Sequence, residues 1–447
     1  MIENDAFKLL LINLFHLNPD DIANILCTTF NKMMVLVVTL ADKHQACPYC
    51  GFTAPKIKEY VTKEITHSAL TTQKCIIKYR ARRYKCSCCG KTYYEFNPFV
   101  FKSQKISILT VHNILKDLKD FNETFTSVAR RYHVSPTSVS TIFDNHVDIG
   151  RNPLPEIINF DEVYAFKSEK SKYVCVLLDF KKQIPVDVLP NRKKEYLLNY
   201  FQKIPLEERK KVKYACSDMY EVYRDVVHKV FPESKHLLDY FHLSQDFHKK
   251  MNEVRIKVMK GYKDNKASDE YYLLKKFNWL LFKNPEDEDK YGRLFDVERE
   301  RKYNSHFKSY MNYYDLRKKI LEINNDLTIC YSLKLELVDF YSKSTIDNAQ
   351  VNLEHLIRSF IDTNIEEMIK FSNNLINWKQ EIINSFTIVG TEYKVEADKG
   401  QVVVCNKKVN NAIIENRNKI IKCIKNNANG YTNWLRFRNR VMYVLDP

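Results

Sequence analysis

The stretch Glu156–Leu189, EIINFDEVYAFKSEKSKYVCVLLDFKKQIPVDVL, decides the fold. It predicts three successive strands, Ile157–Asp161, Tyr173–Asp179 and Ile184–Leu189, because β-branched and aromatic residues alternate with polar ones between charged turns. Asp161 closes the first and most apolar strand. A carboxylate in this place could seat a cation-dependent phosphate chemistry, although most aspartates at strand ends are solvated turn formers.

The segment that follows continues an α/β pattern. We expect a helix in NRKKEYLLNYFQKI, then a strand at Val212–Cys216 that ends at Asp218, and then a second helix. A short strand ending at Asp239 and a helix from about Phe241 repeat the scheme. Strand–helix–strand units give parallel neighbours, and α/β folds hold their sites at the carboxyl ends of such strands. The sequence therefore predicts Asp161 and Asp218 on adjacent central strands.

The composition indicates a basic protein of several domains. The 447 residues include 71 Lys and Arg against 55 Asp and Glu, a net charge of +16. The basic residues cluster among Tyr, Phe and Trp, which favours a nucleic-acid partner over a merely solvated basic surface. No apolar run is long enough to cross a membrane, and the N-terminus lacks a secretory pattern. We therefore expect a cytoplasmic protein with no membrane partner.

Four of the twelve cysteines have the spacing of a metal site. Cys47-Pro-Tyr-Cys50-Gly and Cys86-Ser-Cys-Cys89-Gly are paired C-x2-C knuckles, which predict a structural Zn²⁺ ribbon rather than metal-free thiols. Cys88 could replace Cys89 as a ligand, but only Cys89 keeps the two-residue spacing. A ribbon folded by its metal would present three basic side chains of the intervening strand to DNA, namely Arg80, Arg82 and Arg83.

Residues 104–147 predict helices only. KISILTVHNILKDL forms one helix, and TFTSVARRYHVSPTSVSTIFDNH divides into helix, turn and helix. Val128 and Ala129 face inward, and Ser135 caps a last helix that Pro136 opens. The pattern is typical of a helix-turn-helix that reads DNA, although any three-helix bundle can imitate it. The side chains available to a major groove are Thr137, Ser138 and Ser140.

The remaining segments are expected to be mostly helical. Asn18 and Pro19 predict a helix start before a strand at Met33–Leu40. Residues 250–385 are nearly all helix pattern, with a capping box at Thr363–Glu366. Val402–Val404 predicts part of a small hairpin.

The last amphipathic helices place a carboxylate on a basic face. Ile413, Ile420 and Ile424, with Ile414 and Ile421 beside them, form the expected buried face, and the opposite face is expected to hold Glu415, Asn418, Lys419 and Lys422. Taken alone, Glu415 is best explained by an i,i+4 pair with Lys419. Taken with Asp161 and Asp218, it suits two-metal phosphoryl transfer, because acidic oxygens are the ligands of paired Mg²⁺ (or Mn²⁺) ions.

The order of these motifs resembles one known family, the ISL3 insertion-sequence transposases of the DDE class. The motifs that match run along nearly the whole chain: ARRYKCSCCGKTYYE (81–95), ARRYHVSPTSVSTIFD (129–144), INFDEVYAFK (158–167), CSDMYEVY (216–223), LLDYFHL (237–243) and IIENRNKIIKCIKNNANGYTNWLRFRNRV (413–441). Two departures lie near the third acid: Asn416 follows Glu415 where glycine is common, and Asn410-Asn411-Ala412 replaces a Ser-Asn-Gly turn.

The resemblance implies a multidomain α+β protein with an RNase H-like catalytic core interrupted by a helical insertion. It implies catalytic, Mg²⁺-binding roles for Asp161, Asp218 and Glu415, and it matches Asp239 and His242 to a D-x-x-H element. The expected divisions are 1–100 with the zinc ribbon, 101–150 with the helix-turn-helix, 151–245 and 386–447 as the two parts of the core, and 246–385 as the insertion.

The implied function is DNA transposition by a bacterial, nucleoid-associated enzyme. It would bind the terminal inverted repeats of its element, act as a homodimer in the synaptic complex, cut the ends and join them to target DNA. The side chains expected at the DNA backbone are Arg192, Lys193, Lys194, Lys419, Lys422, Arg436, Arg438 and Arg440, and Trp434 more plausibly packs in the core than on a base. The alternatives are a zinc-ribbon/helix-turn-helix regulator without catalysis and an RNase H-like nuclease that cuts without joining.

Overall fold

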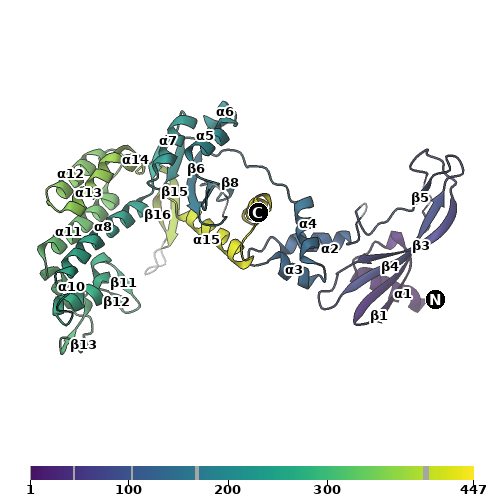
Figure 1. Cartoon of the computed structure of the whole chain (residues 1–447), viewed down its shortest axis with the longest axis horizontal. Helices are drawn as coiled ribbons and strands as arrows, with labels where there is room; N and C mark the ends of the chain where they lie inside the picture. Colours follow the sequence, from purple (N-terminus) through teal and green to yellow (C-terminus); the bar gives the residue numbers. More distant parts are fainter. Residues whose placement is uncertain (1, 44–45, 102–103, 167–170, 396–401, 447) are drawn as a thin grey trace. The chain divides into compact units, whose positions relative to one another are not determined.

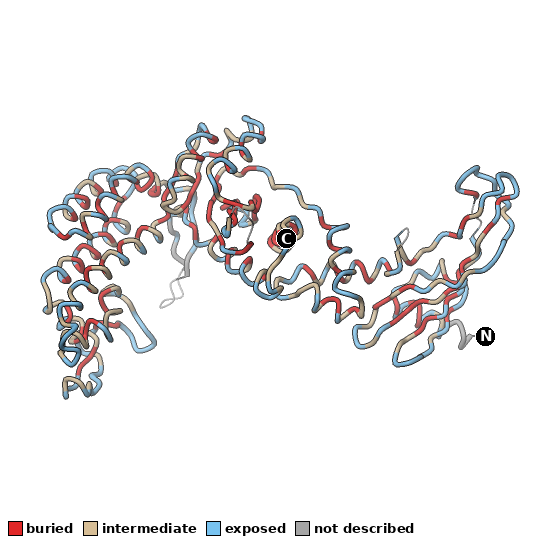
Figure 2. Tube along the Cα trace, viewed as in Figure 1, coloured by how far each residue is buried: buried red, intermediate tan, exposed pale blue. Residues whose placement is uncertain are grey.

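The computed structural model describes residues 2–43, 46–101, 104–166, 171–395 and 402–446. The chain forms two compact units, each with its own buried cores (Figures 1 and 2). The first comprises residues 1–151, 164–168 and 419–447, and the second residues 152–163 and 169–418. In the described part of the chain, every helix is too short or too polar to cross a bilayer. The finer division into five segments stays a prediction.

The first unit begins with a five-stranded sheet in the order β1-β2-β4-β3, with β5 paired to β4. Leu11, Ile12 and Phe15, from α1 and the residue after it, pack against the sheet. The bounds are α1 (Ile2–Leu14), β1 (Ile22–Phe30), β2 (Met33–Leu40), β3 (Lys56–Thr66), β4 (Cys75–Lys85) and β5 (Thr92–Tyr94).

The prediction that a helix starts at Asn18 and Pro19 is confirmed only for a single turn. Asn18 does cap Pro19–Asp21, but these three residues form only a 3₁₀ turn before β1 begins. Asn31 and Lys32 both adopt positive φ, which is the geometry of a two-residue hairpin turn, so β1 pairs antiparallel with β2. Pairing with β2 therefore overrides the local signal for a helix.

A three-helix module follows and confirms the predicted helix, turn and helix. It comprises α2 (Ile108–Asp117), α3 (Phe125–Arg131) and α4 (Pro136–His146). Ser135 caps α4 by accepting a hydrogen bond from the Ser138 amide at 3.0 Å, and Val128 and Ala129 are buried. Tyr443, from the C-terminal helix α16 (Trp434–Leu445), packs against the same core. The sequence did not predict that this distant helix completes the module.

The second unit is built on a five-stranded sheet in the order β10-β9-β6-β7-β8. Strands β6, β9 and β10 are parallel, whereas β7 is antiparallel to both β6 and β8. All three predicted strands of the 156–189 stretch are present. The bounds are β6 (Ile157–Val163), β7 (Val174–Asp179), β8 (Pro185–Leu189), β9 (Tyr214–Ser217) and β10 (Lys235–Leu238).

Helices cover one face of this sheet, and the other face packs against a C-terminal segment. Phe160 on β6 packs against Phe201 and Tyr223, from α5 (Lys194–Gln202) and α7 (Glu221–Val230), with the short α6 (Leu206–Arg209) between those helices in sequence (Figure 1). On the opposite face, Cys216 and Leu237 pack with Val409 and Ile413. Val409 follows the predicted hairpin, which consists of β15 (Ile388–Val395) and β16 (Val402–Lys408); its tip at residues 396–401 lies outside the described residues.

The insertion between β10 and β15 is largely helical, as predicted, and has its own core. Its elements are α8 (Tyr240–Lys260), α9 (Asp269–Lys276), η2 (Asn278–Phe282), β11 (Glu288–Asp289), β12 (Gly292–Arg293), β13 (Lys302–Asn304), β14 (Ser309–Met311), α10 (Tyr313–Glu322), α11 (Asn325–Lys343), α12 (Ala349–Ile361), α13 (Glu366–Asn377) and α14 (Lys379–Asn384). The predicted capping box at Thr363 is wrong, because Ile365 occupies the cap of α13 and makes no side-chain cap bond. The Thr363 hydroxyl instead donates to the Phe360 carbonyl at 2.8 Å.

Helix α15 (Ala412–Asn427) differs from prediction in the side chains it buries. The buried positions are Ile414, Asn418, Ile421 and Ile424, whereas Ile413 and Ile420 are half-buried. Asn418 is only 5 % exposed and therefore does not share the outer face with Lys419 and Lys422. An amide is tolerated in this apolar stripe because it has a hydrogen-bonding partner, described below.

Candidate active site and metal centres

Three aspartates lie in one row across the parallel strands of the second unit. The β6–β9 register pairs Asn159 with Cys216, so two residues further along Asp161 lies level with Asp218. The β9–β10 register pairs Ser217 with Leu238, which brings Asp239 to the same level. Asp218 and Asp239 directly follow their strands, whereas Asp161 lies two residues before the end of β6, which continues to Val163 instead of closing at Asp161 as predicted. The row therefore lies near the carboxyl edge of the parallel strands, where α/β sheets hold their sites. The predicted adjacency of the Asp161 and Asp218 strands is confirmed.

The row concentrates negative charge in a poorly solvated place. Burial raises the pKa of Asp161 to about 7, with a further contribution from the charge of Asp218. Burial and the charge of Glu162 raise the pKa of Asp218 to about 6. Carboxylates this close and this dry are costly to ionise without a cation beside them. The arrangement therefore favours binding of a cation.

Glu415 completes a cluster with Asp239 and His242. One ligand atom from each lies within 4.8 Å of the others. The His242 Nε2 atom lies 3.8 Å from the Asp239 Oδ2 atom, and both atoms are buried without a hydrogen-bond partner. Unsatisfied buried ligand atoms of this kind are what a bound cation would satisfy. His242 also acts electrostatically on Asp161 and Asp218 and lowers the pKa of both carboxyls.

Asn418 and Glu162 also belong to the site, and the sequence did not reveal them. The Asn418 amide donates to the Asp161 Oδ2 atom at 2.7 Å, and the Glu162 backbone N–H donates to Oδ1 at 2.8 Å. Glu162 in turn pairs with the Arg192 guanidinium. The available signals were weak: Asn418 follows Glu415 by one helical turn, and Glu162 is the direct neighbour of Asp161.

Asparagine contacts also hold the start of α15 against the central strand. The Asn159 amide donates to the Asn411 side-chain oxygen at 2.7 Å and to the Asn410 carbonyl at 2.8 Å. The Asn411 carbonyl accepts the first helical hydrogen bond, from the Glu415 amide, at 2.9 Å. The Asn-Asn-Ala turn, a departure from the family pattern, thus positions the third acid firmly.

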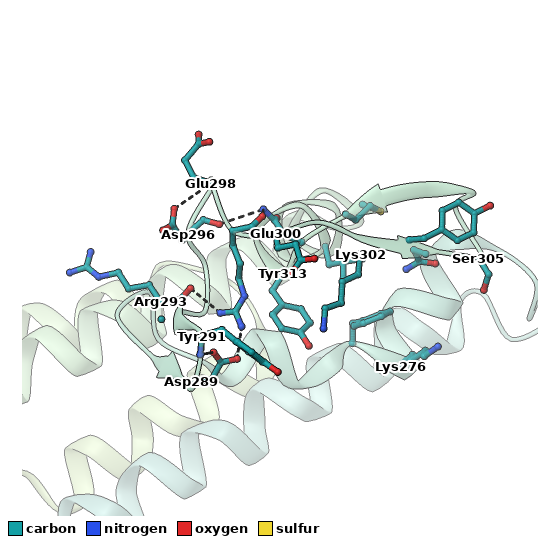
Figure 3. A pocket seen from close by; sticks show the side chains of 18 of the residues that line it. Lys276, Asp289, Tyr291, Arg293, Asp296, Glu298, Glu300, Lys302, Ser305 and Tyr313 are labelled. Carbon is teal, nitrogen blue, oxygen red and sulfur yellow. Dashed lines mark hydrogen bonds and ion pairs between the residues drawn. The ribbon is translucent and has the colours of Figure 1, made fainter.

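One of two cavities in the second unit is lined by residues of this row of acids, and the other lies away from it. A cavity of about 330 Å³ opens onto it and is lined by Arg192, Asp218, His242 and Lys249, among others. A larger cavity of about 720 Å³ lies in the helical insertion (Figure 3). Its charged groups neutralise one another, as in the Arg299–Asp289 pair at 2.6 Å. The smaller cavity, which Asp218 and His242 line together with the basic Arg192 and Lys249, is the one suited to an anionic substrate and a cation.

The four predicted zinc ligands converge in the first unit. Cys47 and Cys89 have their sulfurs 3.8 Å apart, and Cys50 and Cys86 have theirs 3.5 Å apart. Tetrahedral Zn²⁺ with Zn–S bonds of about 2.3 Å requires sulfurs about 3.8 Å apart, so the thiols could hold a zinc ion. The Cys89 amide donates to the Cys86 sulfur at 3.5 Å, and this contact lowers the pKa of the Cys86 thiol to about 7. The set found is Cys47, Cys50, Cys86 and Cys89, without Cys88.

The predicted DNA-contacting residues near the ribbon and on the core differ in how they are held. Arg82 is tied to Glu95 and to the Leu40 and Ala41 carbonyls, which indicates a structural role. Arg83 pairs with Glu59 at the surface, and Arg80 is exposed above the Tyr60 ring. Lys193 occupies the N-cap position of α5 without a side-chain cap bond, and Lys194 pairs with Asp225. Thr137, Ser138 and Ser140 lie in the first turns of α4, with Thr137 exposed.

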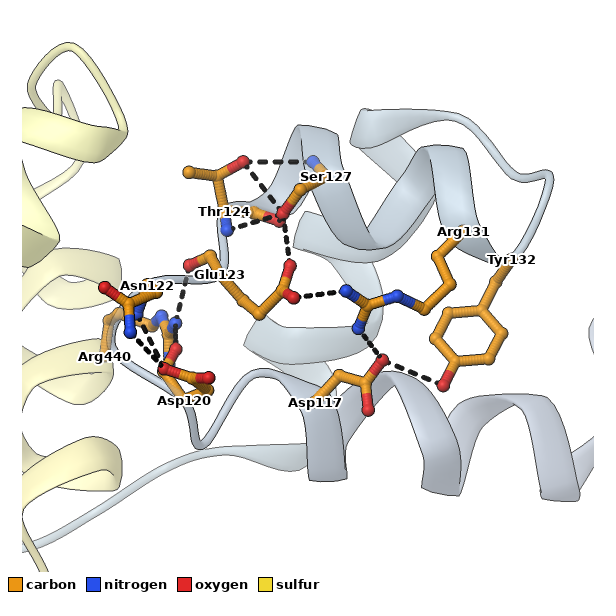
Figure 4. Close-up of polar contacts among 9 residues, drawn as sticks. All are labelled: Asp117, Asp120, Asn122, Glu123, Thr124, Ser127, Arg131, Tyr132 and Arg440. Carbon is orange, nitrogen blue, oxygen red and sulfur yellow. Dashed lines mark hydrogen bonds and ion pairs between the residues drawn. The ribbon is translucent and has the colours of Figure 1, made fainter. Parts of the chain in front are cut away.

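Arg440 has a structural position in the first unit. Its side chain is 1 % exposed and donates to the Asp120 and Glu123 carbonyls at 2.9 Å, in the segment that joins α2 to α3 (Figure 4). Glu123 and Asp117 both pair with Arg131, so the same segment is anchored from both sides (Figure 4).

The other C-terminal residues named from sequence lie around the same module. Arg436 pairs with Asp144 of α4, and Arg438 donates to the Ile149 carbonyl at 2.6 Å. Trp434 is half-buried rather than in the core, and it meets the Phe166 ring edge-on with centroids 5.2 Å apart. Lys419 and Lys422 are exposed on α15.

Comparison with known proteins agrees with this geometry. The model of the ISL3 family of DDE transposases, described as a transposase, matches residues 158–397, which include the row of aspartates. A curated relative, the transposase for insertion sequence element IS1001 of Bordetella parapertussis, is 19 % identical over 391 residues, covering 87 % of this chain and 86 % of its own. The family match spans more than half of the chain, and together these findings show that the protein belongs to the ISL3 family and is a DNA transposase.

Proposed function

We propose that this transposase binds the terminal inverted repeats of its element, cleaves DNA there to expose 3′-OH ends, and joins those ends to target DNA. The observation that supports this most is the level row of Asp161, Asp218 and Asp239 with Glu415 and His242 beside it. A regulator without catalysis would have no need to place three aspartates level on neighbouring strands, with Glu415 and His242 beside Asp239, at a high electrostatic cost.

The sheet of the second unit supports an RNase H-like core. Its order, with three antiparallel strands followed in sequence by two parallel strands on the other side of β6, keeps the first acid on the central strand. The long helical insertion then separates Asp239 from Glu415 in sequence but not in space.

We assign the divalent-ion ligands to Asp161, Asp218 and Glu415, with Asp239 and His242 as additional ligands or positioning groups. Two bound Mg²⁺ or Mn²⁺ ions would supply Lewis-acid stabilisation of the phosphoryl charge and of the attacking and leaving oxygens. The unpartnered Asp239 and His242 atoms and the raised pKa values of Asp161 and Asp218 fit such ligands. No covalent protein–DNA intermediate is required.

The remaining residues of the site orient the acids and the substrate. Asn418 holds the Asp161 carboxylate in one rotamer, and the Glu162–Arg192 pair fixes the cationic wall of the smaller cavity. Lys249 lines the same cavity and would neutralise a DNA phosphate. The Arg192 guanidinium lies over the Tyr220 ring, 4.5 Å from its centroid, which limits its motion.

End recognition is assigned to the first unit. The zinc ribbon with Arg80 and Arg83 and the exposed start of α4 with Thr137 are the surfaces for DNA, as are Lys419 and Lys422. Arg440, in contrast, stabilises the three-helix module from inside. Two ends must be held together for joining, so we propose a homodimer as the active assembly on DNA.

Joining of pre-cut ends is the experiment that tests this function. Purified protein, Mg²⁺ and a duplex ending in the element's 3′-OH should produce covalent joint molecules with a second, unrelated duplex. Ends with a terminal 3′-deoxynucleotide should give none, because they lack the attacking hydroxyl. Cleavage of intact ends without any joining would instead support a nuclease, and binding without either reaction would support a regulator.

Replacement of Asn418 by alanine should slow cleavage about 10- to 100-fold, in line with the loss of a group that orients a metal ligand. The Asp161 carboxylate would lose the 2.7 Å hydrogen bond that fixes its rotamer. Cleavage rates at saturating DNA over a Mg²⁺ titration measure the effect. Asn426→Ala, an exposed asparagine on the same helix, is the matched control and should cleave normally. An unchanged Mg²⁺ titration and rate for Asn418→Ala would contradict the assigned role.

A further inference from the structure

A second group of ligand atoms lies in the second unit, separate from the row of acids. His228 on α7, His236 on β10 and Glu381 on α14 place one ligand atom each within 4.8 Å of the others. The Glu381 Oε1 atom is 3.9 Å from both the His228 Nε2 atom and the His236 Nδ1 atom. These separations are too long for hydrogen bonds. Three polar atoms therefore converge without bonding to one another.

The tautomer of His236 is set by its other ring nitrogen. The Ser217 hydroxyl donates to the Asp218 carbonyl at 2.8 Å, so its single proton is used there. It can then only accept from His236 Nε2, at 2.9 Å, and this nitrogen carries the proton. His236 Nδ1 is left with a bare lone pair, fully buried and without a partner.

That lone pair faces the Glu381 carboxylate, so two hydrogen-bond acceptors lie opposite each other. Glu381 is 4 % exposed, so water does little to separate the two. The nearby Arg224 guanidinium, whose charge acts on both groups, is held above the Trp378 ring and donates to the Asn377 carbonyl at 2.8 Å. Two facing acceptors in a dry place are unfavourable unless a cation joins them.

We propose that His228, His236 and Glu381 form a transition-metal site, best suited to Zn²⁺, that joins the end of the helical insertion to the core. Two imidazoles and a carboxylate are a set that zinc takes, with a fourth position open to water. Tetrahedral bonds of about 2.0–2.2 Å place ligand atoms about 3.4 Å apart, so each 3.9 Å separation closes by about 0.5 Å. Rotation of the exposed His228 side chain would close its own separation from Glu381, and a shift of the Glu381 carboxylate would close the separation from His236.

A metal at this site would also fix hydrogen bonds of the neighbouring strand. A metal on His236 Nδ1 locks the Nε2–H tautomer and hence the bonds through Ser217 to the carbonyl of Asp218. It also reinforces the α14–β10 contact, where the Asn384 amide donates to the His236 carbonyl at 2.9 Å. The metal is structural, and its binding does not depend on DNA cleavage.

Zinc titration of the full-length protein tests the site, with the ribbon already loaded. Wild type should bind one more equivalent of Zn²⁺ than His228→Asn, and Zn²⁺ should raise the melting temperature of wild type by more than that of this variant, which keeps the ribbon and the row of acids. Co²⁺ at this site should show d–d bands without thiolate charge-transfer bands. Glu381→Gln should also lose the equivalent, whereas His355→Asn, an exposed histidine on α12, should keep it.

Failure of the zinc site can be distinguished from failure of the proposed transposition chemistry. Asp218→Asn should retain the equivalent even if it cannot cleave DNA, because its side chain is not a ligand. Equal zinc binding by wild type and His228→Asn, with both melting temperatures responding alike, would overturn the metal site and leave the transposition chemistry untouched.

Discussion

Asp218→Asn is expected to abolish Mg²⁺-dependent nicking of element ends, with a rate loss on the order of 10³-fold or more. The substitution keeps the size of the side chain but removes a carboxylate oxygen from the level row of Asp161, Asp218 and Asp239. Binding of end DNA should survive, because the proposed end-binding surfaces lie in the other unit. Nicking of a labelled end duplex and a gel-shift titration of the same duplex measure the two properties.

Asp225→Asn is the matched control for this experiment. Asp225 lies seven residues further along the chain on α7, where it pairs with Lys194 at the surface. Exposed pairs of this kind contribute little to stability or chemistry, so this variant should nick at the wild-type rate. Undiminished nicking by Asp218→Asn would refute the assignment of the acids, whereas equal losses in both variants would point to general damage.

Cys47→Ser is expected to remove one zinc equivalent and to unfold the ribbon. Zinc binding to structural cysteine sites is worth about 10–16 kcal/mol, which is comparable with the whole stability of a domain. The segment between Cys47 and Tyr94 should then become sensitive to protease, and affinity for end DNA should fall on the order of 10- to 100-fold as the basic surface with Arg80 and Arg83 is lost. Zinc analysis measures the loss of metal, limited proteolysis measures the unfolding, and end-DNA binding measures the loss of affinity.

Cys88→Ser provides the control because Cys88 is an exposed cysteine outside the four-sulfur cluster. It should retain its zinc, its resistance to protease and its affinity for DNA. Loss of zinc from Cys88→Ser, with retention by Cys89→Ser, would show instead that the ligand spacing differs from the two-residue knuckle.

Much of the site could be predicted from sequence because Asp161 and Asp218 lie near or just beyond the ends of strands that local patterns define. The apolar run before Asp161 forms β6 as predicted, and the strand before Asp218 forms its parallel neighbour. The cysteine knuckles were equally readable, since their spacing follows from the metal geometry alone. These are local features, and local features can be predicted without knowledge of the tertiary fold.

Asn418 shows where such reasoning stops. Its polarity suggested the outer face of α15, but the helix packs so that the amide is buried and bonded to Asp161, 257 residues earlier in the chain. Thr363 shows the same limit, because its hydroxyl bonds back to the preceding helix rather than capping the next one.

The sequence by itself predicted the strands of the 156–189 stretch, the four cysteines that cluster and the acids proposed for catalysis, because each prediction depends on neighbours within a few residues. Only the tertiary structure decided that Asp239 and His242 join Glu415, that Arg440 lies inside the helical module, and that His228, His236 and Glu381 converge. Those contacts depend on which faces of distant elements are buried together, and that choice is made by the packing of the whole unit.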